Sequence, residues 1–223
     1  RNAGDVYEYD PTGPTFTLHV DASAVGDWDV THTCVVDHNG VLYALNDEDL
    51  YTVDKTTTNT VTKVADVTST ADTWRSSELA NTRMVATDVG PVWIQRTENG
   101  DTFIHEYNAF TATHSIIGKL PQAFAYPYDI AFAAGFIFVA YRNTDAHASA
   151  GEPFIYFQRG GQRGVVGPLR TPSGGTAGRA LILCGTIGDD LMVHWSGALW
   201  AYNLSEGGFS HVSNLNDNGG AQH

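Results

Sequence analysis

A four-strand unit recurs along this chain, and its spacing limits the possible folds more than any other feature. Within residues 33–64, four short alternating or β-branched runs are separated by turns rich in Asn, Asp and Gly, which tolerate tight backbone bends. The same order returns three times, and one pair of runs precedes it. The third run of each unit begins at Val6, Leu50, Phe103, Phe154 and Leu199. The intervals between these starts are 44, 53, 51 and 45 residues.

Each of these runs predicts a β-strand, and no segment reads as a strong amphipathic helix. The nearest to one is residues 71–79, which we expect to be a connection between units. The predicted strands are residues 6–10, 15–20, 33–37, 41–45, 50–54, 60–64, 83–87, 92–96, 102–107, 113–118, 129–133, 136–141, 154–158, 164–169, 180–185, 190–195, 199–203 and 209–213.

Four-stranded antiparallel units with a period near 45–50 residues are typical of β-propeller blades. The third strand of each unit carries aromatic residues. In a propeller these side chains would fill the gaps between neighbouring blades. A two-sheet sandwich is the alternative, and it requires neither the recurring aromatics nor the even spacing. The sequence therefore predicts one all-β propeller domain over residues 1–223, with a half-blade at 5–20 and blades at 31–67, 83–120, 129–170 and 180–213.

The strand count has a consequence for how the ring closes. These strands make about four and a half blades, whereas a closed propeller needs whole blades. The polar, Gly-rich residues 214–223 are a poor source of further strands. We expect the missing half-blade to lie outside this sequence, in a longer chain or a partner, so that these blades are part of a larger ring.

Composition excludes several classes of partner. Of 223 residues, 42% are hydrophobic, and the net charge is −13. This charge disfavours nucleic acid and anionic membrane surfaces, and no apolar run is long enough to cross a bilayer. Cys34 and Cys184 lack metal-ligand spacing, so we expect free thiols, with a long-range disulfide as the alternative. The chain begins at Arg1 rather than Met, which indicates processing or an excerpt from a longer protein.

Motifs for metal, cofactor or covalent chemistry are absent from the sequence. The nine histidines show neither HxH nor HExxH spacing, and the acidic turns lack the DxDxDG pattern. No GxSxG elbow or P-loop occurs. We therefore expect no cofactor, no metal and no enzymatic activity.

Three carboxylates and two surface segments are nevertheless candidate sites. Asp37, Asp88 and Asp129 lie in or beside first strands, which would line the central channel, so a glycan-cleaving enzyme is one alternative. The long hairpin insertion RNTDAHASAGE and the basic stretch RGGQRG are candidate binding surfaces. Their candidate residues are Arg142, Asp145, His147, Glu152, Arg159 and Arg163. For RGGQRG we expect either a simple hairpin turn or a contact with an acidic partner subunit. The second strands end differently in each unit, which argues against a repeated sugar pocket.

The segment from Ala131 to Ser213, with FIYFQRGGQRGVVGPLR and GDDLMVHWSGALWAYNLSEGGF, resembles propeller-type components of tailed-virus (bacteriophage) particles. The resemblance is clear over about the last third of the chain, and LWxYN followed by a Gly turn also occurs in unrelated propellers. It implies a structural or adhesion domain of a virion tail or tail tip, located in the virion or outside cells. Its partners would be other tail subunits in an oligomeric assembly, with a host-surface glycan or protein as a further partner. No catalytic residues carry over. A lectin-like or protein-binding propeller module is the alternative.

Overall fold

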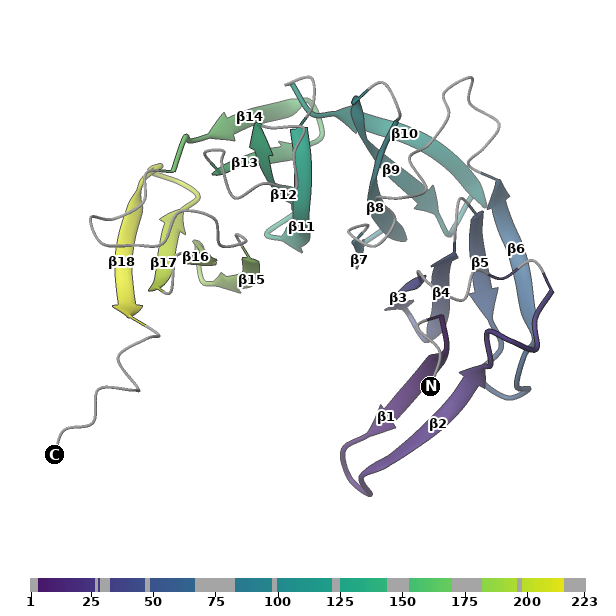
Figure 1. Ribbon diagram of the computed structural model, residues 1–223. Coiled ribbons are helices and arrows are strands. Elements are labelled where there is room, and N and C mark those ends of the chain that lie inside the picture. Colours follow the sequence, from purple (N-terminus) through teal and green to yellow (C-terminus); the bar gives the residue numbers. More distant parts are fainter. Residues whose placement is uncertain are drawn as a thin grey trace, which may run out of the picture. The chain divides into compact units, whose positions relative to one another are not determined.

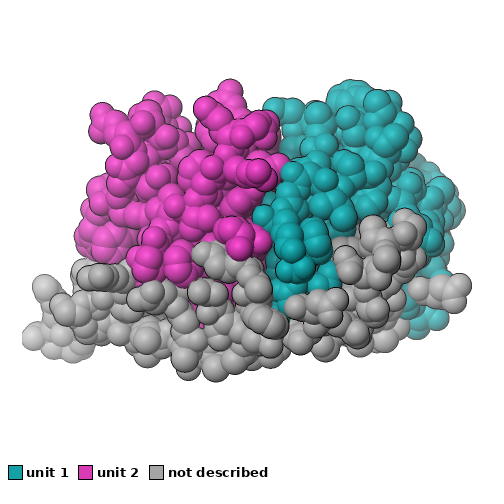
Figure 2. All heavy atoms as spheres, turned by 90° about the horizontal axis from the view of Figure 1, so that it is seen from above, with its two compact units in different colours: residues 1–119 teal, residues 120–223 magenta. Residues whose placement is uncertain are grey.

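The computed structural model describes residues 4–26, 28, 33–46, 49–66, 83–97, 100–121, 125–143, 153–169, 182–195 and 198–214. The chain forms two compact units, residues 1–119 and residues 120–223 (Figure 2). All regular elements in the described ranges are β-strands (Figure 1). No described residue belongs to a helix that could span a membrane. The prediction that residues 1–223 form a single domain stays a prediction.

Unit 1 contains a two-stranded sheet and two four-stranded sheets. The two-stranded sheet is β1 (Val6–Asp10) and β2 (Thr15–Val20). The next sheet is β3 (Thr33–His38), β4 (Val41–Asn46), β5 (Asp49–Val53) and β6 (Val61–Asp66). The last is β7 (Met84–Ala86), β8 (Pro91–Arg96), β9 (Thr102–Asn108) and β10 (Thr113–Lys119).

Unit 2 contains two four-stranded sheets. The first is β11 (Ala125–Ala133), β12 (Phe136–Asn143), β13 (Pro153–Arg159) and β14 (Gln162–Val166). The second is β15 (Ile182–Ile187), β16 (Asp190–Trp195), β17 (Ala198–Asn203) and β18 (Phe209–Asn214). In every sheet the strands are antiparallel and neighbour one another in chain order. This meander is the blade arrangement of a propeller, whereas the Greek-key connections of a sandwich would place non-consecutive strands side by side.

The predicted strand boundaries need two corrections. The first strand of the third blade begins at Ala125 rather than Asp129 and includes a bulge between Pro127 and Asp129. The fourth strand of that blade ends at Val166 rather than Leu169. It ends there because Gly167 adopts a positive φ of 135° and the following proline has no N–H to donate to a strand ladder. Residues 71–79 lie outside the described residues.

One turn motif follows β1 and three of the third strands, β5, β9 and β17. An Asp or Asn side chain at the strand end accepts a hydrogen bond from the backbone N–H two residues later, an Asx turn. The pairs are Asp10 with Thr12 at 2.8 Å, Asp54 with Thr56 at 2.7 Å, Asn108 with Phe110 at 2.9 Å, and Asn203 with Ser205 at 3.1 Å. The β1–β2 hairpin therefore shares this turn with those third strands, and its assignment as a half-blade stays a prediction.

The hydrophobic core lies between neighbouring sheets. In unit 1 the β1–β2 hairpin packs Val6 and Val20 against Ala44 and Val53 of the next sheet. The two four-stranded sheets of unit 1 meet in a second cluster that contains Tyr43, Leu45, Leu50, Trp93 and Tyr107. The two sheets of unit 2 meet in a third cluster that contains Phe138, Ile155, Leu191 and Val193. Full burial of one such side chain stabilises a fold by about 1.5–3 kcal/mol, so each sheet depends on its neighbour.

First strands of successive sheets also contact each other, β3 with β7 and β11 with β15. In unit 2 a carboxylate joins them. Asp129 on β11 accepts a 2.8 Å hydrogen bond from the backbone N–H of Leu183 on β15. Side-by-side first strands are what a propeller requires around its axis.

Candidate functional site

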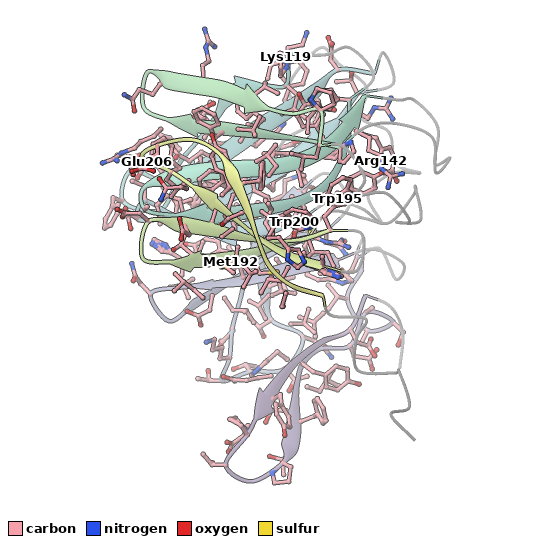
Figure 3. All side chains as sticks on the ribbon, turned by 90° about the vertical axis from the view of Figure 1, so that its left-hand side faces the viewer. Lys119, Arg142, Met192, Trp195, Trp200 and Glu206 are labelled. Carbon is pink, nitrogen blue, oxygen red and sulfur yellow. The ribbon has the colours of Figure 1, made fainter. Side chains whose placement is uncertain are left out.

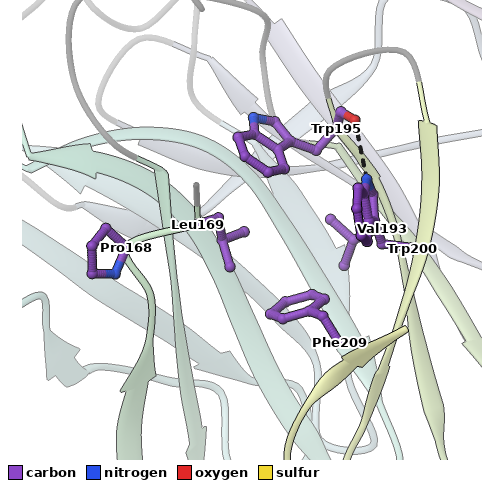
Figure 4. A pocket seen from close by; sticks show the side chains of 6 residues that line it. All are labelled: Pro168, Leu169, Val193, Trp195, Trp200 and Phe209. Atoms are coloured by element: carbon purple, nitrogen blue, oxygen red, sulfur yellow. Dashed lines mark hydrogen bonds between the residues drawn. The ribbon is translucent and has the colours of Figure 1, made fainter. Parts of the chain in front are cut away.

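An apolar pocket opens between the two sheets of unit 2 (Figure 4). Its volume is about 300 Å³, at the lower end of the range for ligand pockets. The described residues that line it are Pro168, Leu169, Val193, Trp195, Trp200 and Phe209.

Strand register places one wall of this pocket, which we call the tryptophan pocket. Val193 and Trp195 alternate along β16 and therefore share a face of the sheet. Trp200 on β17 stands directly opposite Val193, so its ring joins the same face. The two indole rings lie 6.4 Å apart at 46° (Figure 3). The sequence WSGALW thus brings two tryptophans together by folding back into a hairpin.

The opposite wall comes from the neighbouring sheet. Pro168 and Leu169 follow the end of β14, and the Leu169 N–H donates a 2.9 Å hydrogen bond to the Pro153 carbonyl. This bond keeps the segment against β13 after the strand ladder has ended. Figure 4 shows Leu169 pointing into the pocket opposite Val193.

The lining is apolar in its chemistry. None of the six described residues carries an ionisable side chain. The indole N–H of Trp200 already donates to the Trp195 carbonyl at 3.3 Å. The described lining therefore offers mainly apolar contact and aromatic faces, and no described side chain in it can act as a general acid or base.

None of the predicted loop and patch residues that the structure describes lines this pocket. Arg142 is on β12 rather than in an exposed loop, and it is only 3% exposed. Its guanidinium lies 4.8 Å from the ring centre of Tyr128, a cation–π contact. Asp145, His147 and Glu152 lie outside the described residues. Arg159 and Arg163 are exposed on the β13–β14 hairpin.

The three predicted carboxylates each have a separate setting. Asp37 is exposed near the β3–β4 turn, and its ion pair with Lys55 lowers the pKa of the carboxyl group below its ordinary value. Asp88 is exposed in the turn between β7 and β8. Asp129 is half-buried and holds β15 through the Leu183 N–H.

A histidine pair in unit 1, with His105 buried and His114 half-buried, was not predicted from the sequence. Nδ1 of His105 on β9 lies 3.0 Å from Nε2 of His114 on β10, and the Trp93 ring stacks on both. Burial, followed by the neighbouring His114, lowers the pKa of His105 to about 3. Burial also lowers the pKa of His114. The β9–β10 register could have indicated the pair, because His114 is opposite Tyr107 and therefore diagonal to His105.

Among the described residues no group of three or more His, Cys, Asp or Glu side chains is placed to hold a metal ion. Cys34 and Cys184 are both free thiols. Burial raises the pKa of Cys34 to about 12, so this thiol stays protonated at neutral pH.

Comparison with known proteins identifies the fold. No family model and no curated protein matches the chain. A nidogen–laminin complex is 12% identical with a TM-score of 0.55, covering 90% of this chain and 68% of that one. The extracellular domain of a one-component system from B. thetaiotaomicron is 11% identical with a TM-score of 0.56, covering 96% and 28%. A protein assigned as a 6-phosphogluconolactonase from Bacteroides uniformis is 14% identical with a TM-score of 0.53, covering 93% and 63%.

These similar structures are propellers, and at such low identity they establish the fold alone. The chain is an all-β propeller with four-stranded blades. It spans about a quarter of the one-component system domain and just under two thirds of the lactonase-like chain. None of the three is a tail protein, so the tailed-virus relationship depends on the sequence resemblance.

Proposed function

We propose that this chain is a non-catalytic propeller module that binds a protein partner by taking an apolar side chain of that partner into the tryptophan pocket. The observation that carries the proposal is the pocket itself. It has about 300 Å³ of space and two indole rings, and its six described lining residues include no ionisable side chain. Buried aromatic anchors of this kind dominate the energetics of protein–protein contacts.

The pocket chemistry favours a protein side chain over a sugar. A sugar stacked on tryptophan also presents several hydroxyl groups, and each one buried without a hydrogen bond costs about 1–3 kcal/mol. The Trp200 indole N–H is already engaged by the Trp195 carbonyl, and the other described lining residues are aromatic or aliphatic. A phenyl or branched aliphatic group loses no hydrogen bonds on entry.

The absence of catalysis is part of this proposal. Asp129, which lies within the innermost strand of its blade, accepts a hydrogen bond from a backbone N–H of the next blade, which suits a structural role. Asp37 is neutralised by Lys55. Measured activity on a glycan panel that depends on Asp37 or Asp129 would restore the enzyme alternative.

The setting we propose for this module is a virion tail or tail tip, where other tail subunits would be its partners. The similarity of residues 131–213 to tailed-virus propellers supports that setting. A function that depends on contacts with other subunits is consistent with the apolar lining of the tryptophan pocket. Intact-mass measurement and terminal sequencing of the protein from its native source, followed by a search for the same peptides in purified virions, test this part.

The pocket is tested directly with 5-fluoroindole as a probe, followed by fluorine NMR relaxation. We expect saturable binding to the unmodified chain. In Trp200→Ala the affinity should fall at least about tenfold, equivalent to about 1.4 kcal/mol. Phe110→Ala is the matched control, because Phe110 is an aromatic residue 74% exposed in the β9–β10 turn of unit 1. Circular dichroism confirms that each variant is folded.

Two results would overturn the proposal. One is equal binding of 5-fluoroindole to the unmodified chain and Trp200→Ala. The other is saturable binding of simple methyl glycosides that Trp200→Ala abolishes, since that would assign the pocket to a glycan.

A further inference from the structure

The basic side chains of this acidic chain are distributed unevenly. Each of its three lysines is neutralised by a carboxylate, whereas two arginines on the β13–β14 hairpin, Arg159 and Arg163, are exposed and form no ion pair with any described residue. Residues 153–169 contain no Asp or Glu. In a chain of net charge −13, this hairpin is a local positive surface.

This positive surface belongs to the same hairpin segment that leads into one wall of the tryptophan pocket. Arg163 precedes Leu169 of the pocket by six residues, a distance of at most roughly 20 Å in extended chain. The Arg159 guanidinium lies 5.3 Å from the ring centre of Phe136, so its position is partly defined. Val165, between the two features, is 40% exposed. An occupant of the pocket that carries negative charge would therefore meet the two arginines.

The β1–β2 hairpin has the complementary properties. Residues 4–26 contain four acidic residues and no Lys or Arg. Tyr9 and Phe16 stand opposite each other on the two strands, with ring centres 5.0 Å apart, and they are 52% and 54% exposed. The side chain of Glu8, which precedes Tyr9 and stands opposite Thr17, is 55% exposed and lies 3.0 Å from the ring of His19. The hairpin thus presents two adjacent aromatic rings in an acidic surrounding.

We propose that the protein partner of the tryptophan pocket is a second copy of this chain. The β1–β2 hairpin of one copy docks on the β13–β14 hairpin of the next, with an aromatic ring from Tyr9 or Phe16 in the pocket and the acidic residues facing Arg159 and Arg163. Opposite charge at two otherwise apolar surfaces steers association and sets its orientation. This inference rests on the proposed function of the pocket.

The two surfaces differ, so the contact is head-to-tail. Such contacts build a ring if the rotation closes and a filament if it does not, and they do not produce a two-fold dimer. The chain should therefore form species larger than a dimer as its concentration rises. Association should weaken strongly between about 0.1 M and 1 M salt, because the screening length falls from about 10 Å to 3 Å.

Charge exchange in analytical ultracentrifugation is the decisive experiment. One variant, Arg159→Glu with Arg163→Glu, reverses the basic hairpin. The other, Glu8→Lys with Thr17→Lys, reverses the acidic hairpin at two residues that stand opposite each other in register. We expect each variant alone to be monomeric. A one-to-one mixture should associate again, because each altered hairpin then faces an altered partner.

Further variants separate this inference from the function of the pocket itself. Phe16→Ser with Tyr9→Ser should reduce self-association at least about tenfold, and 5-fluoroindole should compete with it. If 5-fluoroindole binds while the unmodified chain stays monomeric at all concentrations, the pocket function holds and the second-copy partner is wrong. Self-association that survives both charge reversals also overturns the inference, as does a mixture of the two variants that fails to associate.

Discussion

The stacked histidine pair of unit 1 leads to a quantitative prediction about stability and pH. His105 has no exposed surface and shares a hydrogen bond with His114 beneath Trp93. Burial, then the neighbouring imidazole, holds the pKa of His105 at about 3, against about 6.5 for histidine in an unfolded chain.

The direction of the effect follows from proton linkage. Because the folded-state pKa is depressed, the unfolded chain binds a proton as the pH falls below about 6.5, while the folded chain does so only near pH 3. Stability from the neutral pair is thus fully present above pH 6.5 and is lost as the pH falls towards 3. The free energy of unfolding should drop by about 2 kcal/mol between pH 7.5 and 5, and by about 4 kcal/mol between pH 7.5 and 3.

Urea unfolding at pH 7.5, 6 and 5 measures this loss. In His105→Gln the fall in unfolding free energy between pH 7.5 and 5 should be smaller than in the unmodified chain by about 2 kcal/mol. Ile104→Val is the control, because Ile104 is a fully buried neighbour on β9. The substitution removes one buried methyl group and should lower the free energy of unfolding by about 0.5–1.5 kcal/mol. It removes no titrating group, so the pH dependence of the unfolding free energy should stay unchanged.

Two observations would refute the reasoning. One is an identical pH dependence in His105→Gln and the unmodified chain. The other is an NMR titration of the folded protein in which the His105 ring protonates near pH 6.5. The measured loss belongs to the pair of imidazoles, since His114 shares the hydrogen bond and its pKa is also lowered by burial.

Two further substitutions test the packing between and within blades. Asp129→Ala leaves the Leu183 N–H without its carboxylate and should lower the free energy of urea unfolding by about 1–3 kcal/mol, whereas Asp88→Ala, at an exposed turn, should stay within about 0.5 kcal/mol. Equal effects of the two would contradict the role of Asp129. Gly90→Ala places a methyl group against the Tyr107 carbonyl at a φ of 154° and should cost about 3 kcal/mol or more. A melting temperature unchanged in Gly90→Ala would show that the backbone there relaxes freely.

Local chemistry allowed the strands and their order to be predicted from the sequence. Alternating apolar runs have the period of a strand, and the turns between them are controlled by side chains a few residues away. Asn39 and Gly40, with φ angles of 53° and 83°, make the turn between β3 and β4 that their residue types favour. Asp10 and Asp54 each close a third strand on their own following backbone. Both partners of each such interaction lie within one hairpin, so the local sequence is enough to predict it.

Contacts across hairpins and sheets could not be predicted in the same way. Alternation shows that Val193 and Trp195 share a face of β16, but it does not show that Leu169 of another sheet lies opposite and leaves a pocket between them. Asp129 was identified as a channel carboxylate, and its hydrogen bond to a backbone 54 residues away became visible only in the folded chain.

What the sequence alone determined, therefore, is the set of strands, their pairing into four-stranded meanders and the acidic surface charge. Tertiary structure decided which faces are covered and which remain open. Arg142 illustrates the division: local pattern placed it in a hairpin insertion after a strand at 136–141, whereas in the folded chain it lies on β12 and is only 3% exposed because of the packing around it. Burial is a property of neighbours distant in the chain, and two residues with the same local pattern can differ in it completely.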